Sequence, residues 1–339
     1  MLQLGGVEFY ITNVCNLACT NCNRLNNYKF SGFQAWKDYK QVYTEWSKTV
    51  NVANIDILGG EPTLNPTFKQ WCVGLRKLWP NATIHVISNG TRLEHTDFYN
   101  LSKDNKIDWR FNAHDRGRNN VIRQYITDTL VEPIKKEYFG NLDNWVNVYN
   151  SIKDDSWPGC SSADDFVTLP QPIQDECTQV HQIDPNSYLE NSNGMLLRDS
   201  NNVEVELQYA EDFVTAPLKY AGNNKFKVYN SVPEEAHSVC ISKNCHHFIK
   251  GKLYKCHHVA LLPEFMQQYQ VDISESDTKL LEDYTPGEVS WSEDKLSEFL
   301  DNLKNPIDQC KLCPSNLEVT SPNGMQPKPS VEKLKTIGA

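Results

Sequence analysis

The feature that most constrains the fold of this 339-residue chain is an alternation of strand-like and helix-like segments in residues 1–150. Short apolar runs predict strands at residues 7–11, 54–58, 83–88, 107–114 and 144–150. Apolar residues at helical spacing predict helices over residues 34–50, 65–79 and 119–136. Strands separated by helices form parallel βαβ units, so we expect an α/β fold. Periodicity leaves open a doubly wound sheet or a complete or partial barrel.

In either architecture, chemistry belongs on the loops at the carboxyl ends of the strands. Three cysteines, Cys15, Cys19 and Cys22, directly follow the first predicted strand. The sequence Gly-Gly-Glu-Pro at residues 59–62 directly follows the second. Because parallel strands end at the same edge of a sheet, the two loops are expected to lie together.

Three thiolates on one short loop can bind one face of a [4Fe–4S] cube and leave one iron for an exogenous ligand. The chain holds 11 cysteines. No signal peptide is expected, because no basic segment or small-residue cleavage site follows Met1. In a protein that is not secreted, cysteines more often serve metal or redox chemistry than disulfide bonds. A zinc site completed by a distant ligand, or three cysteines with no common role, are the alternatives.

Charge and hydropathy limit the partners. The formal net charge is −10, from 33 Lys and Arg against 43 Asp and Glu, and the basic residues are interleaved with acids. A binder of long nucleic acid needs a basic footprint, so such a substrate is not expected. No apolar run approaches the roughly 20 residues that span a bilayer. We therefore expect a cytoplasmic protein without a membrane segment.

The segment "CNLACTNC" (residues 15–22) resembles the cysteine loop of the radical SAM superfamily, although Asn21 stands where that family usually has an aromatic residue. The resemblance implies a partial (β/α)6 TIM-like barrel with a small cysteine-rich C-terminal extension. It also implies that Cys15, Cys19 and Cys22 hold a [4Fe–4S] cluster whose fourth iron binds S-adenosylmethionine. Reductive cleavage of that cofactor would give a 5′-deoxyadenosyl radical that abstracts a substrate hydrogen.

The same resemblance implies contacts to the cofactor. The family's glycine-rich loop binds the methionine amino group, which assigns Gly59, Gly60, Glu61 and Pro62. Two glycines permit positive φ and close backbone approach to a ligand. Ser88 and Asn89 match the end of the family's third strand. Arg110, Asn112 and His114 share one face of a predicted strand, and Asn112 is assigned to the cofactor. The family's glycine-rich fifth-strand motif is not recognisable.

A second cysteine group lies near the C-terminus: Cys240, Cys245, Cys256, Cys310 and Cys313. Four of these five thiols could close a metal site. A hairpin with its turn at Gly251-Lys252 is predicted between the second and the third of them. Mixed Cys and His residues suit zinc and all-thiolate coordination suits an iron–sulfur cube, so composition does not decide. The arrangement resembles the SPASM and twitch extensions of radical SAM enzymes, and its five cysteines imply one auxiliary cluster.

These expectations define three parts: a barrel over residues 1–230, an auxiliary cluster domain over 231–315 and a flexible tail over 316–339. The resemblance implies a radical SAM enzyme that modifies a sugar, a nucleotide-sugar or a similar small molecule, or a peptide. Flavodoxin or ferredoxin would donate electrons. Cys160 and Cys177 are candidate hydrogen donors if the reaction is an epimerisation. A non-catalytic iron–sulfur electron carrier, or a zinc-stabilised binding module, is the alternative.

Overall fold

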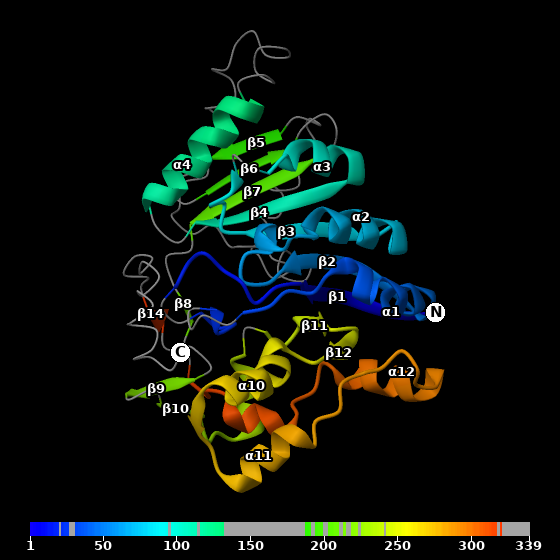
Figure 1. The fold of residues 1–339 in the computed structure, drawn as a ribbon, viewed down its shortest axis with the longest axis vertical. Helices are drawn as coiled ribbons and strands as arrows, with labels where there is room; N and C mark the ends of the chain where they lie inside the picture. Colours follow the sequence, from blue (N-terminus) through cyan, green and yellow to red (C-terminus); the bar gives the residue numbers. More distant parts are fainter. Residues whose placement is uncertain are drawn as a thin grey trace, which may run out of the picture. The chain divides into compact units, whose positions relative to one another are not determined.

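A computed structural model describes residues 1–19, 22–26, 31–93, 96–113, 116–131, 187–190, 194–198, 203–209, 213–214, 218–222, 225–240, 242–316 and 319–320. The chain forms two compact units. The first unit comprises Met1–Asn89 and Glu211–Ala339, and the second comprises Gly90–Ala210. Figure 1 labels their helices and strands.

The first unit is built on a mostly parallel sheet of the order β12-β11-β1-β2-β3. Its strands are β1 (Leu2–Tyr10), β2 (Val50–Leu58), β3 (Thr83–Ser88), β11 (His246–Ile249) and β12 (Lys252–Tyr254). Helices α1 (Trp36–Thr49) and α2 (Phe68–Leu78) connect β1 to β2 and β2 to β3. The strands β11, β1, β2 and β3 pair in parallel, and β12 is antiparallel to β11. The expected α/β class with parallel βαβ units is therefore confirmed.

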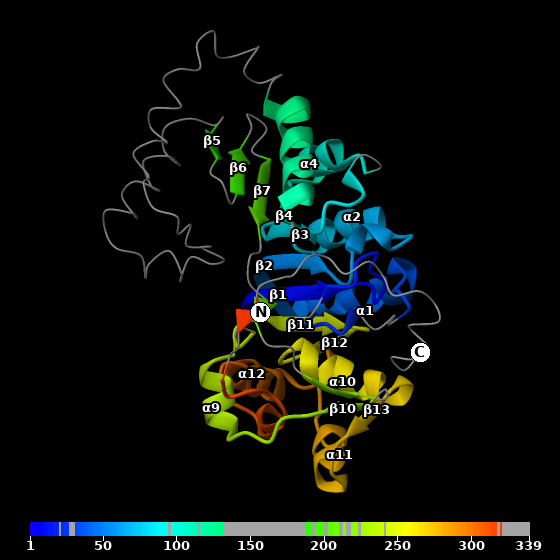
Figure 2. The ribbon, with the colours of Figure 1, turned by 90° about the vertical axis from the view of Figure 1, so that its left-hand side faces the viewer.

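Alternation along β1 sends successive side chains to opposite faces of this sheet. On one face Phe9 packs against Tyr43 of α1 and Trp71 of α2, with ring centroids 5.1 and 6.4 Å away. Figure 2 shows both helices on the same side of the sheet. On the other face Tyr10 packs in a cluster with Leu261 of α10 (His257–Gln268). A C-terminal helix thus covers the face that α1 and α2 leave open.

The second unit pairs β4 (Ile107–Ala113) in parallel with β7 (Glu204–Tyr209). Strands β6 (Gly194–Arg198) and β5 (Ser187–Glu190) continue this sheet in antiparallel order. Its helices are α3 (Phe98–Asn105) and α4 (Arg116–Ile126), the latter continuing into a π-helical turn at Thr127–Val131. The apolar alternation in residues 203–209 also predicts a strand, and the structure has β7 there, whereas β5, β6 and α3 were not predicted. The predicted strand at 144–150 lies outside the described residues.

The C-terminal part of the first unit contains short elements around the hairpin. These are β8 (Phe213–Val214), β9 (Lys219–Gly222), β10 (Lys225–Lys227), α9 (Pro233–Ser238), β13 (Gln270–Asp272), α11 (Glu275–Glu282), α12 (Glu293–Asn302), a 3-10 helix (Asp308–Leu312) and β14 (Val319–Thr320). Phe226, Phe265 and Leu312 lie in a second buried cluster.

The hairpin turn is at Lys250-Gly251, both with positive φ, and not at Gly251-Lys252 as predicted. Positive φ at both central residues suits the right-handed twist of the strands.

Among the helices that the structure describes, none combines the length and the apolar character needed to cross a membrane. Closure of the sheet into a barrel stays a prediction, as does the division into residues 1–230, 231–315 and 316–339.

Candidate functional site

The cysteine loop is joined to the Gly-Gly-Glu-Pro loop by backbone hydrogen bonds that extend the β1–β2 ladder past the strand ends. The amide of Ile11 donates to the carbonyl of Leu58 at 2.8 Å. The amide of Gly60 then donates to Thr12, and that of Glu61 to Val14, both at 2.8 Å. The two loops predicted to meet at the carboxyl edge of the sheet therefore do so, within the first unit.

Close packing of the two loops explains the two glycines. A Cβ atom on Gly59 would lie 2.4 Å from the carbonyl oxygen of Thr12. One on Gly60 would lie 2.4 Å from the carbonyl oxygen of Val14 and 2.8 Å from the Cβ of Cys15. Neither glycine has a positive φ, so that part of the expectation was wrong. The glycines are required because the cysteine loop passes directly over them.

Glu61 is completely buried and joins two segments through its carboxylate. Its Oε1 accepts hydrogen bonds from the Thr63 amide at 3.2 Å, the Thr63 hydroxyl at 2.6 Å and the Ser88 hydroxyl at 2.9 Å. Its Oε2 accepts one, from the Asn89 amide at 2.8 Å. Burial raises the pKa of the Glu61 carboxyl, and these hydrogen bonds offset part of that rise. The end of β3 is thereby fixed to the loop after β2.

Asn89 connects this carboxylate to the cysteine loop. Its Nδ2 donates to Asn16 Oδ1 at 3.1 Å and lies 3.8 Å from the Sγ of Cys15. Pro62, which is buried, begins the 3-10 helix Pro62–Leu64 that follows Glu61. The structure thus brings together the predicted residues Cys15, Gly59, Gly60, Glu61, Pro62, Ser88 and Asn89.

The three thiols of the loop are all half-buried. The amide of Cys22 donates to the carbonyl of Cys19 at 3.3 Å, so a backbone hydrogen bond links the two cysteines. Burial, together with the charges of Cys22 and Cys15, raises the pKa of Cys19 to about 12. Thiolates that oppose one another's ionisation need a positive partner before they can ionise together. Such a set fits an iron–sulfur cluster.

A buried ion network that the sequence analysis did not predict lies beside the Cys22 end of the loop. The Nη2 of Arg24 lies 2.7 Å from Oε2 of Glu8 in β1, and the Nε2 of His247 in β11 lies 2.5 Å from the same oxygen. Although burial raises the pKa of the Glu8 carboxyl, Arg24 and His247 lower it to well below its usual range. A glutamate inside the apolar run of the first strand was the signal available in the sequence.

The predicted polar residues of β4 belong to the second unit. The Nε of Arg110 lies 3.1 Å from Oε2 of Glu206 in β7. Asn112 is half-buried and follows on the same face of the strand. His114 lies outside the described residues, as do Cys160 and Cys177. Within this unit the β4–β7 pair therefore presents a charged face.

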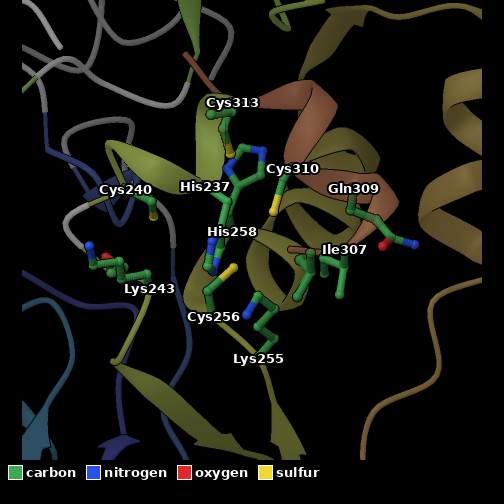
Figure 3. Close-up of a pocket in the computed structure, with 13 residues that line it drawn as sticks. His237, Cys240, Lys243, Lys255, Cys256, His258, Ile307, Gln309, Cys310 and Cys313 are labelled. Carbon is green, nitrogen blue, oxygen red and sulfur yellow. The ribbon is translucent and has the colours of Figure 1, made fainter. Parts of the chain in front are cut away.

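The second cysteine group is gathered around one cavity of the first unit. Its walls include the thiols of Cys240, Cys256, Cys310 and Cys313. Figure 3 shows these side chains around a space that they share with His237 and His258. They come from three places: the end of α9, the start of α10 and the 3-10 helix near residue 310. Three segments distant in sequence thus supply one set of four thiols.

Polar groups without partners surround these thiols. Within the described part of the chain, Nε2 of His237 and both ring nitrogens of His258 are buried and lack a hydrogen bond. Burial lowers the pKa of His258 to about 4 and raises the pKa of Cys256 to about 11. Lys255 is also buried, its Nζ donates to the carbonyl of Leu303, and burial lowers its pKa. Unpaired donors beside four thiols fit an anionic group bound between them.

The fifth predicted ligand, Cys245, does not line this cavity. Burial, with the charge of the nearby Glu8, instead raises its pKa to about 12. Over the residues that the structure describes, no three His, Cys, Asp or Glu side chains converge closely enough to hold a metal ion by themselves. The four cavity thiols therefore surround a space and do not meet at a point.

No protein family matches the sequence, and no curated protein does either. Among solved structures, BtrN in complex with AdoMet and 2-DOIA aligns over 96% of this chain and 98% of its own, at 14% identity and a TM-score of 0.38. Streptococcus suis SuiB bound to S-adenosylmethionine aligns over 32% of this chain at 18% identity and a TM-score of 0.28. SuiB bound to the precursor peptide SuiA aligns over 33%, at 18% identity and a TM-score of 0.29. The aligned part spans 25% of the SuiB chain.

Proposed function

We propose that this protein is a radical SAM enzyme. The observation that carries the proposal is the hydrogen-bonded union of the cysteine loop with Gly60, Glu61 and Asn89 at one edge of the sheet. Cys15, Cys19 and Cys22 would hold a [4Fe–4S] cluster with one iron open. When reduced, that cluster supplies the electron that cleaves S-adenosylmethionine to methionine and a 5′-deoxyadenosyl radical.

Glu61 would orient the cofactor site and bind the methionine ammonium. A carboxylate offers about four lone-pair positions on its two oxygens. Oε1 accepts three hydrogen bonds whereas Oε2 accepts one, so Oε2 has capacity left for an ammonium group. Asn89 supports this arrangement from two sides, since its amide holds Oε2 and its side chain reaches Cys15.

The four-thiol cavity would hold one auxiliary [4Fe–4S] cluster. A structural zinc ion is enclosed by four ligands at about 2.3 Å, whereas no three His, Cys, Asp or Glu side chains of the described residues converge closely enough to hold one ion. Hydrogen bonds to the sulfurs of a cluster tune its potential, and His237, His258 and Lys255 bring nitrogen donors to this space. The four ligands would be Cys240, Cys256, Cys310 and Cys313.

The substrate is proposed to be a sugar, a nucleotide-sugar or a similar small molecule, or a peptide, with flavodoxin or ferredoxin as the electron donor. A closed electron carrier is the competing function. It is disfavoured because an electron-transfer cube needs four protein ligands, and the N-terminal loop supplies three thiols.

The test is cofactor cleavage without substrate. Reconstituted protein given dithionite and S-adenosylmethionine should slowly release 5′-deoxyadenosine and methionine. Cys19→Ala should abolish the release, because two thiolates are too few to hold a cube at that loop. Cys313→Ala should retain it, because that thiol belongs to the other site. A wild-type protein that carries its clusters and releases no 5′-deoxyadenosine would show that the proposal is wrong.

A further inference from the structure

The ion network at Glu8 places a half-buried positive charge beside the N-terminal cysteine loop. Arg24 follows Cys22 by two residues, and its guanidinium interacts electrostatically with that thiol. Its Nη2 is bound to Glu8 at 2.7 Å and its Nη1 donates to Asn23 at 3.3 Å. Its Nε is buried, and among the described residues it has no hydrogen-bond partner. One N–H of the guanidinium is therefore left for a group held by the loop.

The position of this guanidinium is determined by the sheet. Glu8 lies opposite His247 in the parallel β1–β11 register, and the two side chains are 2.5 Å apart. His247 is completely buried, and its ring centroid lies 5.3 Å from that of His257. His257 directly follows Cys256, a thiol of the second cavity. Polar side chains thus connect Arg24 through Glu8 and His247 to His257, the residue after Cys256.

A buried ion network of this kind needs a reason beyond stability. Taking charges out of water is costly, and well-packed apolar residues often stabilise a fold as well as a buried ion pair does. The face of the sheet that carries Glu8 also carries the apolar residues Tyr10 and Leu58 one layer above, so apolar packing is feasible there. A retained charge at this place is explained if it acts on a charged group in the loop.

We propose that Arg24, held by Glu8 and His247, is a positioning residue that tunes the cluster of the N-terminal loop. This inference rests on the proposed function. A cluster becomes more negative when it accepts an electron, so a fixed positive charge nearby favours the reduced state. Hydrogen bonds to the sulfurs of a cluster also tune its potential, and the Nε of Arg24 is available to make one. Arg24 therefore raises the reduction potential of the cluster that must reduce S-adenosylmethionine.

The experiment is a redox titration of the reconstituted full-length protein, followed by EPR. The N-terminal cluster is identified as the signal that changes when S-adenosylmethionine is added. Arg24→Met should shift its midpoint potential to a more negative value, whereas Arg24→Lys keeps the charge and should stay nearer to wild type. Glu8→Gln removes a negative charge and should shift the potential in the opposite direction. The potential of the second cluster should move less in all three variants.

Asp56→Asn is the matched control. Asp56 lies opposite Glu8 in the β1–β2 register and also binds a histidine, His85, at 3.1 Å. It should shift the potential of the N-terminal cluster less than Glu8→Gln does, because Asp56 is not bound to Arg24. If Arg24→Met loses iron because Glu8 is left unpaired, the double variant Glu8→Met with Arg24→Met restores neutral packing, and its potential should lie below that of Glu8→Met alone.

The outcomes separate the two proposals. A wild-type protein that binds no cluster at Cys15, Cys19 and Cys22 contradicts the proposed function. If the wild-type protein binds the cluster but Arg24→Met has the wild-type potential, or the double variant has the potential of Glu8→Met alone, only the role of Arg24 is overturned. Equal shifts in Arg24→Met and Arg24→Lys would also overturn it, because the charge would then be irrelevant. Opposite shifts in Arg24→Met and Glu8→Gln support it, because loss of a purely structural pair predicts no opposite signs.

Discussion

The two cysteine sites of the first unit are built in different ways. The N-terminal site takes its thiols from one loop of eight residues and depends on neighbouring strand ends for the rest of its surroundings. The second site collects Cys240, Cys256, Cys310 and Cys313 from segments spread over more than 70 residues. A local loop can leave one coordination position open, because three ligands from one side cannot enclose a cube. Ligands that arrive from several directions can enclose one completely.

The largest effect is expected when each set of thiols is removed in turn, which tests whether the two sites have different roles. Wild-type protein should contain about eight irons, since each [4Fe–4S] site holds four. The triple change of Cys15, Cys19 and Cys22 to Ala should leave about four irons and no cleavage of S-adenosylmethionine. Cys256→Ala should lower iron to a similar level yet preserve cleavage. Iron analysis and chromatography of 5′-deoxyadenosine are the measurements, and identical behaviour of the two variants would contradict the division of roles.

A second test asks whether the N-terminal site depends on the contact between its two loops. Gly60→Ala places a Cβ 2.4 Å from the Val14 carbonyl oxygen, so the cysteine loop must move. We expect iron at the N-terminal site to fall by half or more, and iron at the second site to stay. Gly5→Ala in β1 is the control, because nothing lies within 4 Å of the added carbon. Equal iron content in the two variants would show that the loop does not need the glycine.

These contacts also show how far the sequence alone reaches. The parallel strands β1, β2 and β3 and helices α1 and α2 follow from periodicity, and the site at their carboxyl edge follows from topology. Both are local signals. By contrast, the pairing of β11 with β1, which places His247 beside Glu8, joins residues about 240 positions apart. Nothing in the spacing of residues 240–258 predicts that register, so the ion network could not be found from the sequence.

The structure also changes what we expect of Glu61. From the sequence, Glu61→Gln should weaken S-adenosylmethionine binding and leave folding unaffected, since a charge facing an ammonium is lost. The structure adds a cost, because the amide group of Gln must replace an oxygen that accepts a hydrogen bond. If the NH2 group of Gln takes the place of Oε2, it faces the backbone amide of Asn89, and two hydrogen-bond donors then oppose each other.

We therefore expect Glu61→Gln to weaken cofactor affinity at least tenfold and to lower the free energy of unfolding by about 1–3 kcal/mol. Calorimetry of cofactor binding and thermal unfolding measure the two effects. Thr63→Val is the matched control, since it removes one hydroxyl donor to Oε1 and leaves the charge in place. It should lose stability with a much smaller change in affinity. Unchanged affinity in Glu61→Gln would mean that this carboxylate only connects the loops.

The smallest expected effect concerns the fifth C-terminal cysteine. In the sequence, Cys245 and Cys256 bracket a hairpin, and the ends of a hairpin lie close together, which suggested that both could bind one metal group. The structure separates them, because Cys245 lies near Glu8 and outside the cavity, whereas Cys256 precedes α10 and lines the cavity. Cys245→Ser should keep all of the roughly eight irons, because the hydroxyl can retain the contact with Glu8. Cys256→Ser should lose about four of them, and this contrast tests the assignment directly. Loss of four irons from Cys245→Ser would place that thiol among the ligands, and one of the four cavity thiols would then have to be free.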